Sequence, residues 1–257
     1  MSIERKPLTA RSVLASTLLG TEPPWLPTRT LVRAGALFGI AEGTVRVALS
    51  RMTSAGELEP SGDGYRLVGR LLDRQARQAA SRRAATRPWD GTWELAMVRS
   101  GDPRRAADRA ALRSALADLR LAELREGVWL RPDNLPADRS PEARRVAAEQ
   151  CLWGRGAVLE PAPDPAALWD LAGWAADAEE LRAELAELLP GIEAGDTQAL
   201  RAGFEASAAV LRLLQHDPLL PSELLPPDWP GEALRADYDH YDAVWRAAFR
   251  HHLDAAD

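Results

Sequence analysis

The stretch AEGTVRVALSRM (residues 41–52) decides how this 257-residue chain begins to fold. Its apolar side chains recur at positions i, i+3, i+4 and i+7, the spacing of one face of an α-helix. An amphipathic helix over about 42–54 is therefore predicted. The inward side chains are Val45, Ala48, Leu49 and Met52. The outward side chains are Thr44, Arg46, Val47, Ser50 and Arg51.

Two short helices are expected in front of it. Thr9 is the expected N-cap of the first, which ends at Gly20 ahead of two prolines. The second opens at Pro27 and Thr28 and ends at Gly39. Two short helices, a turn that contains glycine and a third amphipathic helix form the helix-turn-helix order.

A hairpin is expected directly after the third helix. Short strands at Glu57–Glu59 and Tyr65–Val68 flank the turn Ser61-Gly62-Asp63-Gly64. Asp-Gly between two extended runs is a strong hairpin signal. A hairpin in this place is the wing of a winged helix.

This arrangement predicts an interface for double-stranded DNA, because the third helix of such a motif enters the major groove. Arg46 can pair with guanine through two hydrogen bonds, and Thr44 and Ser50 can donate to bases or phosphates. The wing would bring Tyr65 and Arg66 to the sugar–phosphate backbone. The predicted DNA-contacting set is Thr44, Arg46, Val47, Ser50, Arg51, Arg29, Tyr65, Arg66, Arg70 and Arg74. The alternative is an ordinary solvated helix face with a strand that alternates between core and solvent.

The charge distribution supports a DNA-binding front, although the whole chain has a net charge of −6. Residues 1–90 hold 14 basic and 8 acidic side chains, a net charge of +6, and residues 91–257 have a net charge of −12. One basic module on an acidic remainder is expected when only that module meets nucleic acid. The basic helix expected over 70–88 either contacts phosphates or serves as a solvated strut between domains.

The middle of the chain alternates between strands and helices. Strands are expected at 89–100 and 125–132, with a helix over 102–124 between them that starts at Asp102 and Pro103. An unassigned stretch then leads to a last strand around Ala157–Glu160. This pattern fits an α+β domain of ferredoxin-like type.

The last third is predicted to be helical. Two helices are expected at 165–188 and 196–215, and the five prolines within residues 216–231 favour a rigid extended strap. A last helix over about 232–253 carries a regularly spaced seam: Leu234, Tyr238, Tyr241, Trp245, Ala248 and His252. The seam packs either on the chain's own helices or on the same helix of a second copy in a dimer.

Several stretches in this order resemble the PaaX family of transcriptional regulators. They are GALFGIAEGTVRVALSRMTSAGELE, GYRLVGRLLDRQARQ, WDGTWELAMV, LRLAELREGVWLRP and HDPLLPSELLPPDWPG. The resemblance implies a winged helix, a central domain like that of CRISPR-adaptation endonucleases and a C-terminal helical domain. It also implies a homodimeric repressor released from its operator by an acyl-CoA thioester, phenylacetyl-CoA in the namesake. The chain departs from the family pattern at Thr92 and Glu94. The expected domain limits are 1–69, 70–88, 89–163 and 164–257.

The sequence offers no recognisable catalytic or metal-binding motif. We therefore predict no catalytic residue, metal or cofactor, and keep an enzyme that acts on nucleic acid or on a CoA ester as the alternative. The single cysteine, Cys151, and the lack of a secretory segment favour the cytoplasm, and no apolar run is long enough for a membrane span. The candidates for an acyl-CoA site are Trp93, Trp129, Trp153, Arg131 and Arg155.

Overall fold

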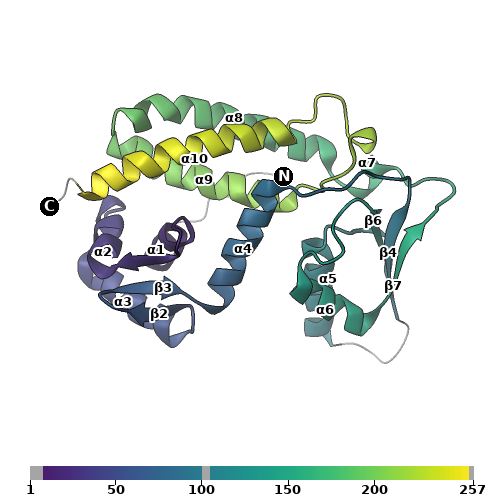
Figure 1. Cartoon of the computed structure of the whole chain (residues 1–257), viewed down its shortest axis with the longest axis horizontal. Coiled ribbons are helices and arrows are strands. Elements are labelled where there is room, and N and C mark those ends of the chain that lie inside the picture. The colour runs from purple at the N-terminus through teal and green to yellow at the C-terminus, as the bar shows by residue number, and fades with distance from the viewer. Residues whose placement is uncertain (1–7, 100–104, 255–257) are drawn as a thin grey trace. The chain divides into compact units, whose positions relative to one another are not determined.

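The computed structural model describes residues 8–99 and 105–254 (Figure 1). The chain forms two compact units. The first comprises the described residues up to Ala79 together with 177–212 and 232–254. The second comprises the described residues of 80–176 and 213–231. Segments from both ends of the sequence therefore share the first unit.

The first unit begins with helices α1 (Ala10–Leu19), α2 (Thr28–Leu37) and α3 (Glu42–Ser54). Thr9 caps α1 as predicted, because its hydroxyl accepts a hydrogen bond of 3.1 Å from the backbone N–H of Ser12. The three helices share one hydrophobic core. The main members of this core are Leu14, Leu18, Leu31, Val45, Leu49 and Met52. The predicted helix over 42–54 is confirmed.

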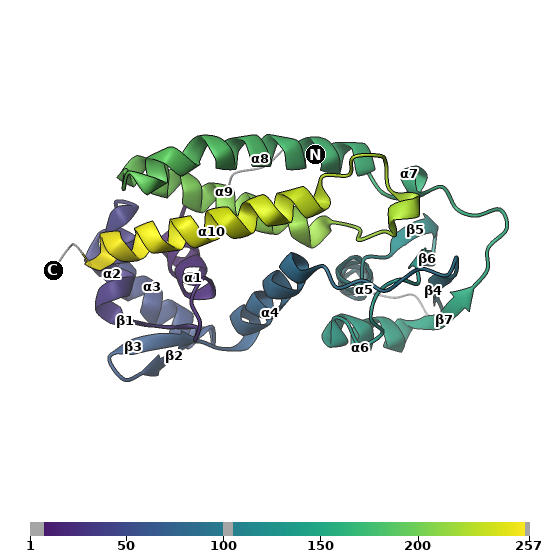
Figure 2. The ribbon, with the colours of Figure 1, turned by 45° about the horizontal axis from the view of Figure 1, so that its top comes forward.

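Three short strands form an antiparallel sheet of order β1-β3-β2 in this unit (Figure 2). They are β1 (Trp25–Pro27), β2 (Leu58–Ser61) and β3 (Gly64–Leu67). β2 and β3 are the predicted wing. The sequence does not predict β1, because three residues beside prolines are too few to show an alternating pattern.

Two glycines shape the wing. Gly62, in the two-residue loop between β2 and β3, has a φ of +62°, which an L-residue rarely adopts. A Cβ atom on Gly64 would overlap the carbonyl oxygen of Leu26 in β1. The glycine at position 64 therefore lets β1 pair closely with β3.

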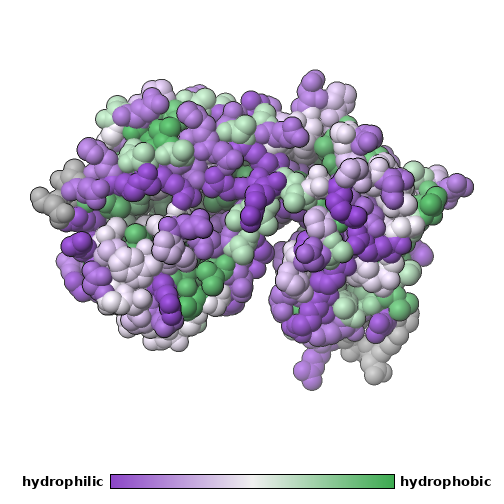
Figure 3. Space-filling view, in the orientation of Figure 1, coloured by the Kyte–Doolittle hydropathy of each residue, from purple (hydrophilic) through white to green (hydrophobic). Residues whose placement is uncertain are grey.

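Helices α8 (Leu171–Glu193), α9 (Thr197–His216) and α10 (Gly231–Asp254) run side by side, and most of each belongs to the first unit (Figures 1 and 2). The Trp245 indole of α10 donates a hydrogen bond of 3.0 Å to the carbonyl of Leu200 in α9. The seam predicted on α10 thus packs on the chain's own helices. Its buried members are Leu234, Tyr238, Tyr241 and Trp245. The outward surface of α10 is mostly hydrophilic (Figure 3).

The second unit is built around a four-stranded antiparallel sheet of order β5-β6-β4-β7. Helices α5 and α6 cover one face of this sheet (Figure 1). The βαββαβ order confirms the predicted ferredoxin-like architecture. The elements are β4 (Trp93–Val98), α5 (Ala106–Asp118), β5 (Ala122–Arg125), β6 (Val128–Pro132), α6 (Pro141–Gln150) and β7 (Cys151–Ala157).

The helix expected over 102–124 and the strand expected over 125–132 are both corrected. Asp102 and Pro103 lie outside the described residues, and α5 begins at Ala106. At the other end, Arg120 has a φ of +62°, a left-handed conformation that ends the helix. The next residues form β5, which pairs with β6 as a hairpin.

The stretch left unassigned before the last strand is helix α6. Pro141 occupies the first helical turn, where its missing N–H costs nothing. Only Ala143 and Ala147 are buried on this helix, so its apolar periodicity is weak in the sequence. The last strand consequently begins at Cys151 rather than near Ala157, and Cys151 is buried.

The remaining elements connect these parts. Helix α4 (Gly69–Arg83) begins where the basic helix over 70–88 is expected, but it ends at Arg83. The helix expected over 165–188 is interrupted after α7 (Pro165–Leu168), and α8 continues to Glu193 with Pro190 inside it. The proline-rich strap contains a single 3₁₀ turn, Ser222–Leu224, among the described elements.

Candidate nucleic-acid interface

Helix α3 is fixed in the first unit by its buried side. Val45, Leu49 and Met52 are at most 1% exposed. α2 lies close against this side, because a Cβ atom on Gly35 would overlap the Val45 side chain. The packing therefore forces the opposite side of α3 into solvent. The exposed residues include all five predicted outward ones: Thr44, Arg46, Val47, Ser50 and Arg51.

Arg46 is held along the helix by Glu42, one turn earlier. The Arg46 Nε donates to the Glu42 carboxylate at 2.8 Å, and a second nitrogen lies 2.7 Å from the same oxygen. Both side chains are more than half exposed, so this ion pair contributes little to stability. A phosphate or a guanine edge can replace the carboxylate at small cost, and the guanidinium fork suits both.

The other exposed residues of α3 add complementary chemistry. Arg51 forms no hydrogen bond or ion pair with any residue in the described ranges, so its donors remain free. Val47 is 51% exposed, which is unusual for a valine. An exposed apolar side chain beside arginines suits contact with a thymine methyl group.

The wing carries a second exposed ion pair. Arg66 in β3 donates to Glu59 in β2 at 2.9 Å, directly across the strands. Tyr65 is half-buried and packs against the hydrophobic core of this unit. Arg66 therefore faces solvent at the wing, while Tyr65 anchors the wing to the core with its ring.

Two residues outside the predicted DNA-contacting set hold the wing turn in place. The Trp25 indole donates to the carbonyl of Ser61 at 2.9 Å, and the Thr28 hydroxyl donates to the carbonyl of Asp63 at 2.8 Å. Both contacts cross more than 30 residues of sequence. In the sequence, the sole indication of these two contacts is Trp25, an aromatic residue that lies between prolines.

A buried carboxylate joins α1 to the start of the wing. Arg11 forms two hydrogen bonds to Glu57, and the Nε bond measures 2.9 Å. These bonds hold the pKa of the Glu57 carboxyl below its ordinary value, against the opposing effect of burial. Glu57, expected at the start of the first wing strand, lies just before β2, which begins at Leu58, and forms a structural ion pair.

The remaining predicted DNA contacts differ in exposure. Arg29, near the start of α2, and Arg70, near the start of α4, are exposed. Arg74 is half-buried, and burial together with neighbouring arginines lowers its pKa. Arg29 and Arg70 are therefore better placed for phosphate contacts than Arg74.

In the second unit, Arg131 has a structural environment. It is fully buried, and its five N–H groups all have acceptors within this unit. The acceptors include the carbonyls of Pro218 and Leu219 and the side chain of Asn134. Arg131 ties the proline-rich strap to the sheet and has no exposed surface for a ligand.

A buried glutamate organises the helix-covered face of the same sheet. Glu94 pairs with Arg139 at 2.6 Å and Arg144 at 2.9 Å and accepts a hydrogen bond from the Trp153 indole. Burial by itself raises the pKa of the Glu94 carboxyl, but the two guanidinium groups outweigh it and hold the pKa below its ordinary value. Glu94, which departs from the family pattern, is thus the hub of an ion-pair network.

The five candidate acyl-CoA residues are not gathered at one place. The strand register sets Trp129 and Trp153 opposite Ala96, whereas Trp93 points to the other face of the sheet. Arg155 donates to the Asp133 carboxylate at 3.1 Å. The acyl-CoA site predicted from these residues stays a prediction.

Within residues 8–99 and 105–254, no three His, Cys, Asp or Glu side chains are grouped so that they could hold a metal ion. The helices of these ranges include none with the length and apolarity to cross a bilayer.

The structure defines a three-part α+β protein: a winged-helix segment, a ferredoxin-like segment and a helical C-terminal segment. Three matches cover these parts: residues 9–74 match the PaaX-like protein family, 86–154 the PaaX central Cas2-like domain and 169–255 the PaaX-like C-terminal domain. The chain belongs to the PaaX-like family.

Two relatives support this assignment. The chain is 29% identical over 238 residues to the transcriptional repressor PaaX of Escherichia coli (strain K12). The match covers 82% of this chain and 71% of the Escherichia coli protein. It also resembles the solved structure of the uncharacterized protein Rv0674 from Mycobacterium tuberculosis. The comparison of the two structures gives a TM-score of 0.74 and 42% sequence identity, and it covers 96% of this chain and 99% of the Mycobacterium chain.

Proposed function

We propose that this protein is a transcriptional repressor that binds double-stranded DNA through α3 and the wing. The observation that carries the proposal is the exposed face of α3, where Arg46, Arg51 and Val47 project from a helix anchored on its opposite side. The relationship to a protein named as a transcriptional repressor supports the same function.

The finer parts of the proposal rest on the family resemblance. The protein would act in the cytoplasm as a homodimer, so its operator would contain two inverted half-sites spaced by whole helical turns. A small-molecule effector such as an aryl- or acyl-CoA thioester would release it from DNA. On this proposal the protein is a sensor rather than an enzyme.

Substitution of Arg46 tests the DNA interface. Arg46→Ala is expected to weaken binding to the protein's own promoter DNA by about 1–3 kcal/mol, since it removes a two-bond contact with one base. Fluorescence anisotropy measures the change, and circular dichroism checks the fold. Arg113→Ala, which removes an exposed arginine of the second unit that pairs with Glu123, serves as the matched control. Unchanged affinity for Arg46→Ala would show that α3 does not read the operator.

Incubation with an aryl-CoA thioester separates the sensor from an enzyme. A sensor is expected to leave DNA while the thioester stays intact, whereas an enzyme would hydrolyse the thioester or cut the DNA. A protein without any effector would bind DNA unchanged, and its thermal stability would not respond to the thioester.

A further inference from the structure

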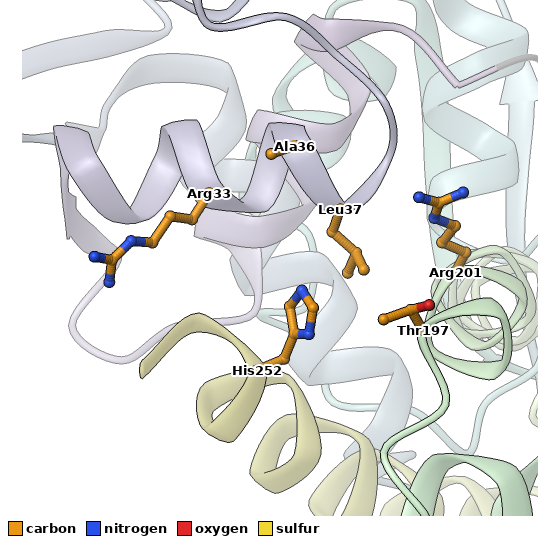
Figure 4. Close-up of a pocket in the computed structure, with 6 residues that line it drawn as sticks. All are labelled: Arg33, Ala36, Leu37, Thr197, Arg201 and His252. Carbon is orange, nitrogen blue, oxygen red and sulfur yellow. The ribbon is translucent and has the colours of Figure 1, made fainter. Parts of the chain in front are cut away.

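An open pocket of about 240 Å³ lies inside the first unit, where α2 meets α9 and α10 (Figure 4). Two wall residues are apolar and three carry a basic side chain. None of the described residues that line it carries a carboxylate. The lining consists of Arg33, Ala36, Leu37, Thr197, Arg201 and His252.

Two of the basic side chains have no polar partner among the described residues. Arg201 and His252 make no hydrogen bond or ion pair with any residue in the part of the chain that the structure describes. Figure 4 shows the His252 ring beside Leu37, with Thr197 and Arg201 on the α9 side. A guanidinium and an imidazole thus stand free around a hollow with one apolar wall.

Arg33 has a different position. Its guanidinium is turned away from the other lining residues (Figure 4), and one nitrogen donates to the carbonyl of Leu253 at 2.8 Å. Leu253 lies in the last turn of α10, so Arg33 fastens α2 to the end of α10. Arg33 therefore builds a wall of the pocket and leaves Arg201 and His252 as its donors.

We propose that this pocket binds the oxyanion group of a small organic acid. Arg201 and His252 would donate to a carboxylate or phosphate, because charge-assisted hydrogen bonds to such groups are the strong ones. Leu37 and Ala36 would contact the apolar part of the ligand. The volume is below the roughly 300–1,000 Å³ of pockets for drug-sized ligands, so the site suits a small acid rather than a complete coenzyme thioester.

The pocket lies on the side of α2 that faces away from α3. Gly35 is the α2 residue that packs on Val45 of α3. Successive helical residues are rotated by about 100°, so Leu37 projects about 200° from Gly35. A ligand against Leu37 would therefore press on the helix that supports α3, and we expect it to change DNA affinity. This coupling rests on the proposed function, whereas binding of the acid does not.

Titration of the full chain tests the site. Benzoate, inorganic phosphate and neutral benzyl alcohol would be added separately, and NMR would follow the ring signals of the four histidines. The His252 signals are expected to shift saturably with benzoate or phosphate but not with benzyl alcohol. Equal responses to benzyl alcohol, or no saturable response to either anion, would overturn the proposal.

Matched variants identify the donors. Arg201→Gln is expected to weaken anion binding by about tenfold or more, the effect of losing one charge-assisted hydrogen bond. Arg250→Gln removes an exposed charge from α10 outside the pocket and should leave binding unchanged. His251→Gln, next to His252 but not in the lining, should also bind normally. If Arg201→Gln binds as tightly as the wild type, the assigned site is wrong.

A DNA measurement distinguishes the two proposals. If benzoate binds but DNA affinity is the same with and without it, the coupling to α3 is wrong and the pocket stands. If Arg46→Ala leaves DNA binding intact, the proposed DNA interface is wrong, whatever the His252 titration shows.

Discussion

At the scale of single residues, the arginines of the proposed DNA interface differ in the contacts that they would have to give up to bind DNA. Arg51 is free of partners among the described residues, whereas Arg46 and Arg66 are each paired with a carboxylate. A carboxylate beside a DNA-contacting arginine repels phosphate and competes for the guanidinium. Glu42 therefore tunes the proposed interface, although it cannot itself bind DNA.

Glu42→Gln is expected to tighten DNA binding by about 0.5–1 kcal/mol, because the Glu42 carboxylate no longer competes with DNA for Arg46. An exposed ion pair contributes a free energy of about this magnitude. The gain should be largest at low salt and shrink as salt screens the charge. Anisotropy titrations at several salt concentrations measure both effects. As the control, Glu126→Gln removes the same charge from the second unit and should have little effect on DNA binding. Weaker DNA binding by Glu42→Gln would mean that Glu42 positions Arg46 rather than competing for it.

Glu94 makes stability depend on pH. Its folded pKa lies below the ordinary value of 4.5, so its ionisation stabilises the fold fully above that pH and loses this effect as pH falls through the folded pKa. Glu94→Gln should cost about 3–5 kcal/mol at neutral pH, because Arg139 and Arg144 lose a buried counter-charge. Denaturant unfolding should show this deficit shrinking below about pH 4.5, and a deficit that stays constant with pH would contradict the ionic role.

At the scale of elements, strong local patterns predict well and long-range contacts do not. Helix α3 follows from its own spacing, and the wing follows from its Gly-Asp-Gly turn. Strand β1 and helix α6 escape prediction, because β1 exists through pairing with β3 and α6 buries only two alanines. The outward side of α3 was predictable for the same reason as its buried side, since one periodicity fixes both.

The close pairing of β1 and β3 gives a sharp test of the wing. Gly64→Ala should destabilise the protein by about 1–3 kcal/mol, because the added Cβ overlaps the Leu26 carbonyl, which is backbone and cannot rotate away. Thermal unfolding measures the loss. Gly43→Ala in α3 is the control, since a Cβ there meets nothing within 4 Å and should be neutral or slightly stabilising. Equal stability for both variants would place β1 away from β3.

At the scale of the whole molecule, the limits 1–69 and 164–257 expected for separate domains stay a prediction, yet 177–212 and 232–254 share one compact unit with the N-terminal residues. Arg246 of α10 donates to the carbonyl of Gly20, and the Phe38 ring lies 4.8 Å from the Phe204 ring of α9. Sequence patterns cannot show this, because each helix displays the period of its own buried face but not the identity of its partner.

Phe204→Ala tests whether these distant segments unfold together. Phe204 is buried between Phe38 and Trp245, with ring centroids 4.8 and 5.9 Å away, so its loss should cost about 3–5 kcal/mol. In one cooperative unit, amide hydrogen exchange should accelerate in α2 as well as in α9 and α10, while β4 and β6 of the second unit keep their protection. Phe249→Ala removes a ring that stacks on Trp245 within the same helix, α10, and should affect α2 less. Acceleration confined to α9 and α10 would instead show that the winged helix is stable without them, as the sequence-based limits imply.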